Sequence, residues 1–221
     1  MNFYFKEYSN ATCEGWSKKK WKAFGLNQLN LLFDYFNAYL DPDLKSKLNS
    51  ICTLEVVPRN TILQKQNEPI TGLFYILSGT AKKTIDIGDE EQITMLYDEG
   101  GLIMALDGLV NGTPAEVNIK TIEKCFVLVL KYEDLLSLMN SEHGQNLKDV
   151  VTLVVNKAGA SIIEFSSILR FPNEQKVAVL HEKYPILFEK FTLKNIASLI
   201  GINPESFTRL NKLVLSKNST N

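Results

Sequence analysis

The sequence TLKNIASLIGINPESFTRLNK, which spans Thr192 to Lys212, has the spacing of two short helices joined by a tight turn. The first helix is expected from Leu193 to Ile200, with apolar residues on one side. Gly201 follows, where a residue without a Cβ adopts the left-handed conformation of a turn most easily. A second helix is expected from Pro204 to about Val214, because Asn, Pro and Glu occupy its start in the order that favours helix initiation. This arrangement is typical of a helix-turn-helix motif.

The second predicted helix has a polar outer face that suits DNA. A glutamate can accept a hydrogen bond from the amino group of cytosine, and an arginine can bind a guanine edge through two bonds. Serine and threonine can reach bases or phosphates. The alternative is an ordinary helical hairpin with a solvated face. The candidate DNA-binding residues are Asn203, Glu205, Ser206, Thr208, Arg209 and Lys212, together with Lys194 on the preceding helix.

A longer run, FPNEQKVAVLHEKYPILFEKFTLKNIASLIGINPESFTRLNKLV from Phe171 to Val214, resembles the C-terminal domain of the Crp/Fnr family of bacterial transcription regulators. The recognition helix of that family carries Glu, a hydroxyl residue, an apolar residue, a small residue and Arg, and residues 205–209 match this order. The resemblance implies that Glu205 and Arg209 read bases and that Ser206 holds the DNA backbone.

Charge and composition agree with this interpretation. The 221 residues carry a net charge of −1, but from Leu169 onward there are eight basic and four acidic residues. Local positive charge is what phosphate attraction requires. The three cysteines, Cys13, Cys52 and Cys125, have neither metal-ligand spacing nor a disulfide pattern, so the sequence predicts no cofactor, no metal and a reducing cytoplasmic location. No apolar run approaches the length of a membrane span, so no membrane partner is expected.

The middle of the chain has the pattern of a β-structure. Before it, helices are expected at residues 29–40 and 42–51. Between residues 52 and 130, short β-rich runs are separated by turn residues, which predicts an antiparallel sandwich or barrel. The run LFYILSGTAKKTI from Leu73 to Ile85 resembles the cyclic-nucleotide-binding β-roll. The predicted strands are 52–57, 61–64, 73–77, 80–87, 92–96, 116–122 and 125–130.

The ligand site of this predicted roll departs from the family pattern. In the nucleotide-binding members of the family, the Glu of a Gly-Glu pair binds the ribose and an Arg binds the cyclic phosphate. The equivalent positions here fall at residues 103–105 and 113–115, and there is no arginine between Arg59 and Arg170. A buried phosphate without a cationic partner is poorly compensated, so we expect no binding of cyclic AMP or cyclic GMP. A more apolar ligand and a closed structural roll remain alternatives. The candidate pocket residues are Ile103, Met104, Leu106, Thr113 and Ala115.

A helical pattern returns from Tyr132 to Leu169. After a short helix at residues 133–139, apolar and small residues alternate in steps of four and three, which predicts a heptad seam for a parallel homodimer. Burial against the chain's own roll is the alternative for part of this helix. Val155, Ile162 and Leu169 form a flanking apolar row. The candidate dimer residues are Leu147, Val151, Val154, Ala158, Ser161 and Phe165.

Together these patterns predict an α+β protein with four parts. They are an N-terminal arm (1–28), a cyclic-nucleotide-binding-like antiparallel β-roll as sensor (29–140), a dimerisation helix (141–169) and a helix-turn-helix, winged-helix-like domain (170–221). The expected function is a dimeric regulator that binds an inverted repeat in double-stranded DNA. RNA polymerase and an unidentified small-molecule effector are candidate further partners. No enzyme motif is found. The alternative function is a regulatory or scaffolding protein of the same fold that does not bind DNA.

Overall fold

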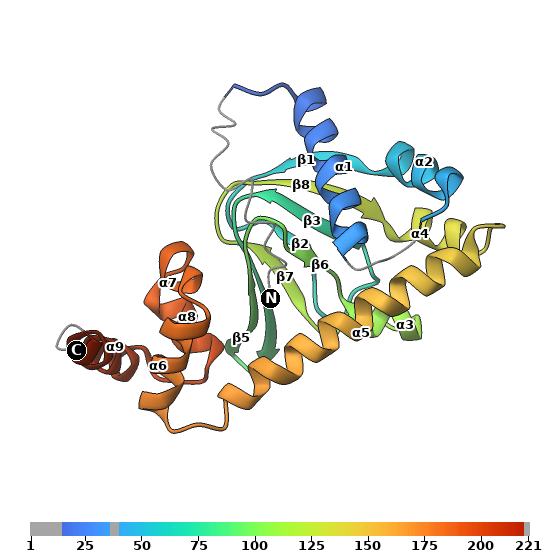
Figure 1. Ribbon diagram of the computed structural model, residues 1–221. Helices are drawn as coiled ribbons and strands as arrows, with labels where there is room; N and C mark the ends of the chain where they lie inside the picture. Colours follow the sequence, from blue (N-terminus) through green and yellow to red (C-terminus); the bar gives the residue numbers. More distant parts are fainter. Residues whose placement is uncertain (1–14, 36–39, 219–221) are drawn as a thin grey trace.

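The computed structural model describes residues 15–35 and 40–218 (Figure 1). Helices at both ends of the chain flank a central set of strands. The strands are β1 (Thr53–Val57), β2 (Ile62–Gln64), β3 (Gly72–Ser78), β4 (Ala81–Ile87), β5 (Glu90–Tyr97), β6 (Leu102–Ile103), β7 (Asn118–Thr121) and β8 (Cys125–Lys131). The helices are α1 (Lys18–Tyr35), α2 (Pro42–Ile51), α3 (Leu106–Asn111), α4 (Tyr132–Met139), α5 (Gly144–Ile168), α6 (Asn173–Lys183), α7 (Ile186–Lys190), α8 (Leu193–Leu199) and α9 (Pro204–Asn218).

Two antiparallel four-stranded sheets form the predicted β-roll. One has the strand order β1-β8-β3-β6 and the other β2-β7-β4-β5. Alternate residues of a strand face opposite sides of a sheet. On β8, Val127 and Val129 therefore enter the core between the sheets, whereas Leu128 and Leu130 join clusters with the flanking helices. Both faces of this sheet are thus apolar, and its outer face needs a helical cover.

The N-terminal helices supply part of that cover. Asp41 accepts a hydrogen bond from the backbone N–H of Leu44 at 2.8 Å and caps α2, whose predicted bounds of 42–51 are confirmed. The first helix begins at Lys18, which is eleven residues earlier than residue 29. Trp21 is 5% exposed, and its ring stacks on Phe126 of β8 with centroids 4.4 Å apart. Part of the predicted arm is therefore a helix packed on the roll, because the tryptophan is buried while the adjacent lysines stay in water.

The long helix α5 runs beside the roll and leads to helices α6–α9, at the left of Figure 1. Leu147 and Val150 near its start are buried against the roll and its flanking helices. Ile168 at its end is buried among the C-terminal helices. One side of α5 therefore packs against its own chain, as the alternative interpretation of its sequence allowed. No helix in the described part of the chain combines the length and the apolar character of a transmembrane span.

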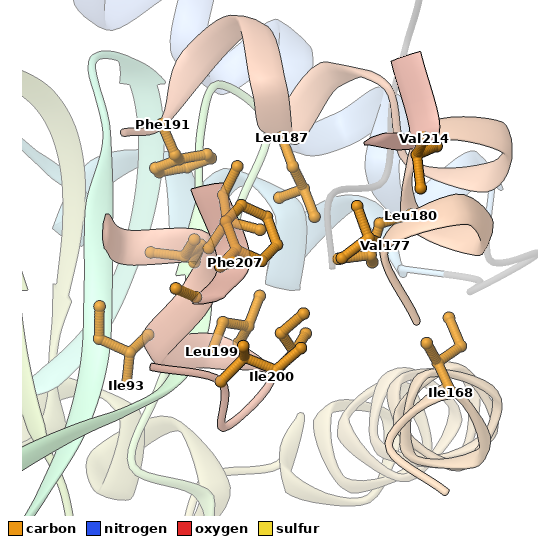
Figure 2. Close-up of a cluster of buried hydrophobic side chains, with 14 residues drawn as sticks. Ile93, Ile168, Val177, Leu180, Leu187, Phe191, Leu199, Ile200, Phe207 and Val214 are labelled. Carbon is orange, nitrogen blue, oxygen red and sulfur yellow. The ribbon is translucent and has the colours of Figure 1, made fainter. Parts of the chain in front are cut away.

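A single apolar cluster joins the roll to the C-terminal helices (Figure 2). Ile93 and Leu96 of β5 belong to the same buried cluster as Phe207 of α9. The backbone N–H of Ile93 also donates to Ser198 Oγ at 3.2 Å. At the margin, Lys190 Nζ lies 2.9 Å from Glu99 Oε2, and this hydrogen bond raises the pKa of Lys190. The C-terminal helices are therefore docked on β5 rather than tethered by a linker.

Several elements differ from the sequence prediction. The short strand β6 and helices α3, α6 and α7 were not predicted. No strand follows β8 in the described residues up to 218, so the expected winged-helix character is wrong for this part of the chain.

The shared cluster predicts that β5 stabilises the C-terminal helices. Ile93 is 4% exposed, and its truncation to alanine leaves a cavity between β5 and α8. We expect Ile93→Ala to lower the free energy of unfolding by about 2–5 kcal/mol, measured by urea denaturation. Ile87→Ala is the matched control, because Ile87 of β4 is 61% exposed and should change stability by about 0.5 kcal/mol or less. Equal effects of the two substitutions would contradict the shared core.

Candidate nucleic-acid interface

The α8–turn–α9 segment is built by local capping. Thr192 Oγ1 accepts a hydrogen bond from the N–H of Asn195 at 3.3 Å and starts α8. Gly201 has φ 66°, the left-handed value that reverses the chain. Asn203 Oδ1 then accepts from the N–H of Glu205 at 2.9 Å, which starts α9. The predicted helices and turn are therefore present, with α9 four residues longer than expected.

The inner face of α9 is fixed by packing and by one buried polar contact. The side chains of Phe207, Ile196 and Ala197 are fully buried, so α8 and α9 approach closely. Asn211 is 8% exposed, and its Oδ1 lies 2.6 Å from His181 Nε2. The imidazole of His181 also stacks on the ring of Phe188, with centroids 3.7 Å apart. These contacts set the rotation of α9 about its axis and thereby decide which residues face outward.

The outward face carries three exposed charged residues. Glu205, Arg209 and Lys212 are separated by four and three positions, so they share one side of the helix. In the described part of the chain, Arg209 and Lys212 form no ion pair with an acidic residue. An exposed arginine without an intramolecular partner has its five donors available for a ligand. The face can therefore offer one acceptor and two cations to an external surface.

The other predicted DNA-binding residues differ in exposure and in their intramolecular hydrogen bonds. Asn203 is exposed, but its side-chain oxygen is used as the cap of α9. Thr208 is half-buried, and its hydroxyl donates to the carbonyl of Pro204 at 2.9 Å. Ser206 is also half-buried. Lys194 is exposed on α8, the helix before the turn.

One nearby cation was missed by sequence reasoning. Lys176 of α6 places its Nζ 3.4 Å from the carbonyl oxygen of Ile200, beside the turn between α8 and α9. The two residues are 24 positions apart, so no local pattern links them. Only the packing of α6 on α9 in the C-terminal core brings this lysine to the interface.

The candidate pocket residues have different environments. Ile103 is fully buried in the core between the sheets, and Thr113 is exposed. Met104 is half-buried and lines a cavity on the other side of β3 and β8, while Leu106 is half-buried at the start of α3. Ala115 is 1% exposed and packs with Ile70. The five predicted residues therefore differ in exposure, and Leu106, Thr113 and Ala115 lie around α3.

An apolar cluster includes Ala105 and Ala115, two of the positions that the resemblance aligns with the ligand residues of the family. Ala105 and Ala115 are buried together with Ile70. A Cβ added at Gly108 of α3 would lie 2.4 Å from Cδ1 of Ile70, so the isoleucine already fills the space against this helix. An anionic phosphate at this place would lose hydration without gaining a cationic partner.

Three of the six predicted dimer residues, Leu147, Val151 and Phe165, contact other parts of the chain. Leu147 is 4% exposed and Val151 is half-buried. The ring of Phe165 meets that of Tyr184 edge-to-face at 5.7 Å. The side chains of Val154, Ala158 and Ser161 lie outside the described part of the structure. Both ends of the predicted seam therefore pack against other parts of the same chain.

The exposed side of α5 includes Ile162, which belonged to the row flanking the predicted seam. Val155 and Gly159 are half-buried, whereas Ile162 and Ser166 are exposed, and these four residues follow in steps of four, three and four. Ile163, beside this row, is 73% exposed. A Cβ at Gly159 would meet nothing within 4 Å. We call Val155, Gly159, Ile162, Ile163 and Ser166 the outer row of α5.

Comparison with known proteins agrees with the roll architecture. Residues 54–142 match the family model of the cyclic nucleotide-binding domain. No curated protein sequence matches the chain. The matched residues include all the strands from β3 to β8 and the helices α3 and α4. Residues 54–142 are therefore similar to a cyclic nucleotide-binding domain.

Three solved structures extend the likeness to the helices. The c-di-GMP-responsive global regulator CLP of Xanthomonas campestris is 18% identical, with a TM-score of 0.61 over 78% of this chain and 91% of CLP. FixK2 from Bradyrhizobium japonicum is 13% identical, with a TM-score of 0.63 over 76% of this chain and 86% of FixK2. A transcriptional regulator of the Crp/Fnr family from Eubacterium rectale is 16% identical, with a TM-score of 0.65 over 86% of this chain and 88% of that protein. At these identities the likeness concerns the fold, which is that of Crp/Fnr regulators, as the sequence resemblance predicted.

Proposed function

We propose that this protein is a dimeric, sequence-specific DNA-binding transcription regulator of the helix-turn-helix type. The observation that carries the proposal is the outward face of α9. Its Glu205, Arg209 and Lys212 point away from a helix whose opposite side is locked into the core. The wide groove of B-form DNA accepts one α-helix, and the first residues of a recognition helix contact the base edges.

The chemistry of the face assigns a role to each exposed side chain. Arg209 donates two hydrogen bonds to a guanine edge, and Glu205 accepts one from a cytosine amino group. Lys212, one turn further along α9, meets a phosphate. Lys194 and Lys176 lie on neighbouring helices and add positive charge for the DNA backbone. Ser206 and Thr208 have smaller roles because both are half-buried.

A second copy of the chain is required for useful affinity. One recognition helix contacts only a few base pairs, whereas two related by a twofold axis bind half-sites about 34 Å apart. We assign the pairing surface to the outer row of α5, which is apolar at Ile162 and Ile163 and small at Gly159. Steps of four and three are the spacing of a two-helix seam, and a glycine permits a close approach of the two backbones.

A protein that kept the fold without DNA binding is the second candidate. Leu213 and Leu215 of α9 are 41% and 46% exposed, and such residues would suit contact with another protein. They lie in the second half of α9, away from Glu205. The experiments below separate the two functions, because a protein-binding helix would not distinguish one duplex sequence from another.

Arg209 gives a direct test of base reading. For a duplex selected for binding, we expect Arg209→Ala to weaken the affinity by about 1–3 kcal/mol per site, or roughly 5- to 150-fold, and to relax the preference for one base pair. Fluorescence anisotropy at a fixed salt concentration measures both effects. Arg170→Ala is the matched control, because Arg170 is exposed between α5 and α6 and lies off the proposed face.

The outcome that would remove Arg209 from this role is an unchanged affinity with unchanged sequence preference. Lys212→Ala should behave differently from Arg209→Ala. The loss of a phosphate contact weakens binding to all duplexes alike and lowers the salt dependence by about one counterion.

The outer row predicts how the dimer can be broken. We expect Ile162→Glu to raise the dissociation constant of the dimer on the order of a hundredfold, because each copy would bury an unpaired carboxylate in an apolar contact. Sedimentation equilibrium measures this constant. Ile87→Glu makes the same change at an exposed isoleucine of β4, away from α5, and should leave the dimer intact. A dimer insensitive to Ile162→Glu would place the interface elsewhere.

The sensor is proposed to lack the usual cyclic-nucleotide response. The resemblance aligns the ribose and phosphate residues of the family with positions 103–105 and 113–115, where Ala105 and Ala115 are buried in an apolar cluster with Ile70. Isothermal titration with cyclic AMP and cyclic GMP should therefore show no binding at micromolar concentrations. Saturable micromolar binding of either nucleotide would overturn this part of the proposal.

A further inference from the structure

A cavity of about 70 Å³ lies between the outer face of the sheet β1-β8-β3-β6 and the helices that cover it. Residues Tyr75, Leu128 and Leu130 form its floor, and they alternate along their strands with residues of the inner core. The cavity is therefore on the opposite side of the sheet from the core between the two sheets. Its walls come from helices α1 to α5. They include Leu109 of α3 and Val150, Val151 and Val155 of α5, with Leu102 and Met104 beside them.

The lining of this cavity is apolar and uncharged. Among the described lining residues, only Tyr75 has a hydroxyl group and only Cys52 has a thiol. Burial raises the pKa of the Cys52 thiol to about 11 and also raises that of the Tyr75 phenol, so both groups are neutral at physiological pH. No carboxylate, ammonium, guanidinium or imidazole belongs to the described lining. An ionic ligand would enter this space without a partner for its charge.

The size of the cavity distinguishes it from an ordinary packing defect. Protein interiors contain few voids larger than one water molecule. A buried water needs roughly 10–15 Å³ of cavity volume and two to four hydrogen-bonding partners. The volume of this cavity would admit several waters, but its walls have too few hydrogen-bonding groups to hold them. Apolar cavities of this kind stay dry and accept hydrocarbons. The favourable occupant is therefore a molecule that gains dispersion contacts and needs no hydrogen bonds.

We propose that this cavity is a binding site for a small uncharged hydrocarbon-like molecule, with the size of a single aromatic ring or a short alkyl chain. The binding itself does not depend on DNA recognition, whereas its regulatory consequence rests on the function proposed above. The site differs in place and in chemistry from the nucleotide position at Ala105 and Ala115.

The position of the cavity on α5 links occupancy to dimer pairing. Val150, Val151 and Val155 line the cavity, and Val155 is also the first residue of the outer row. A ligand in the cavity thus contacts the helix that carries the pairing surface. If the ligand prefers one position of α5, it shifts the population toward that position and alters the separation of the two α9 helices.

Benzene is a suitable probe for this site because it is uncharged and consists of one ring. We would titrate benzene into the full chain labelled with ¹³C at the methyl groups of leucine, valine and methionine. Saturable ring-current shifts are expected at Leu128, Val151 and Met104, with smaller changes at Val127 and Val129 on the inner side of β8. A melting temperature that rises with benzene concentration should accompany them. Non-saturable shifts, or shifts centred on the inner core, would overturn the proposal.

A matched pair of variants locates the binding. Leu109 is half-buried and lines the cavity, whereas Leu136 of α4 is 38% exposed and does not. Leu109→Phe should fill the space and reduce benzene affinity at least tenfold, while Leu136→Phe should leave it unchanged. Leu102→Phe, on β6, provides a second filling variant if Leu109→Phe does not fold. Equal benzene affinity in the wild-type protein and in a folded filling variant would refute the site.

DNA binding, measured on the same proteins without benzene, separates the two proposals. Retained DNA binding with no benzene site would refute the cavity proposal alone. Saturable benzene binding by a protein that is indifferent to DNA would support the cavity and refute the regulatory function.

Discussion

The apolar contact between β5 and the C-terminal helices is the constraint on which the rest of the structure depends. The side chains of Ile93 and Leu96 on β5 belong to the same buried cluster as three residues of the C-terminal helices (Figure 2). These are Val177 and Leu180 of α6 and Phe207 of α9. Burial of apolar surface is the dominant favourable term in such packing. Because the inner face of α9 is used here, its charged residues can only lie on the opposite side. The surface proposed to read DNA is therefore a consequence of how this core is filled.

The polar contacts at the same junction have a smaller energetic role. The ion pair between Lys190 and Glu99 is partly exposed, with side-chain exposures of 36% and 41%. Such surface pairs contribute about 0–1 kcal/mol. The hydrogen bond from Ile93 to Ser198 satisfies a backbone donor at the contact. These bonds fix the register of α8 on β5, while the apolar cluster provides the larger share of the stability. The roll, α5 and the C-terminal helices are consequently parts of one packed structure, through which a change at α5 can reach α9.

Local signals in the sequence were sufficient to predict the helices and strands whose ends are marked by capping residues or turns. Asp41 with Pro42 marked α2, Asn203 with Pro204 marked α9, and alternation with turn residues marked most strands. The start of α1 was missed because lysines surround Trp21, and only its stacking on Phe126 explains the burial. Of the six residues that were predicted on the outer face of α9, four are exposed and two, Ser206 and Thr208, are half-buried. The exposed ones are Asn203, Glu205, Arg209 and Lys212.

Features that depend on long-range packing could not be derived from local patterns. Two apolar rows run along α5, and periodicity alone does not show which one faces water. The burial of Leu147 and Ile168 against other parts of the chain decides this, and it moves the proposed dimer surface to Ile162 and Ile163. Lys176 reaches the turn only through tertiary packing. The outer cavity is likewise defined by helices and strands that are distant in sequence.

Selection of bound duplexes from a random-sequence DNA pool with the purified protein is the most direct test of whether two copies of α9 read DNA together. We expect enrichment of an inverted repeat whose half-sites are centred about 34 Å apart, which is one turn of the double helix. A pool that stays unenriched after repeated rounds, or that yields only an unrepeated half-site, would contradict paired recognition by this surface.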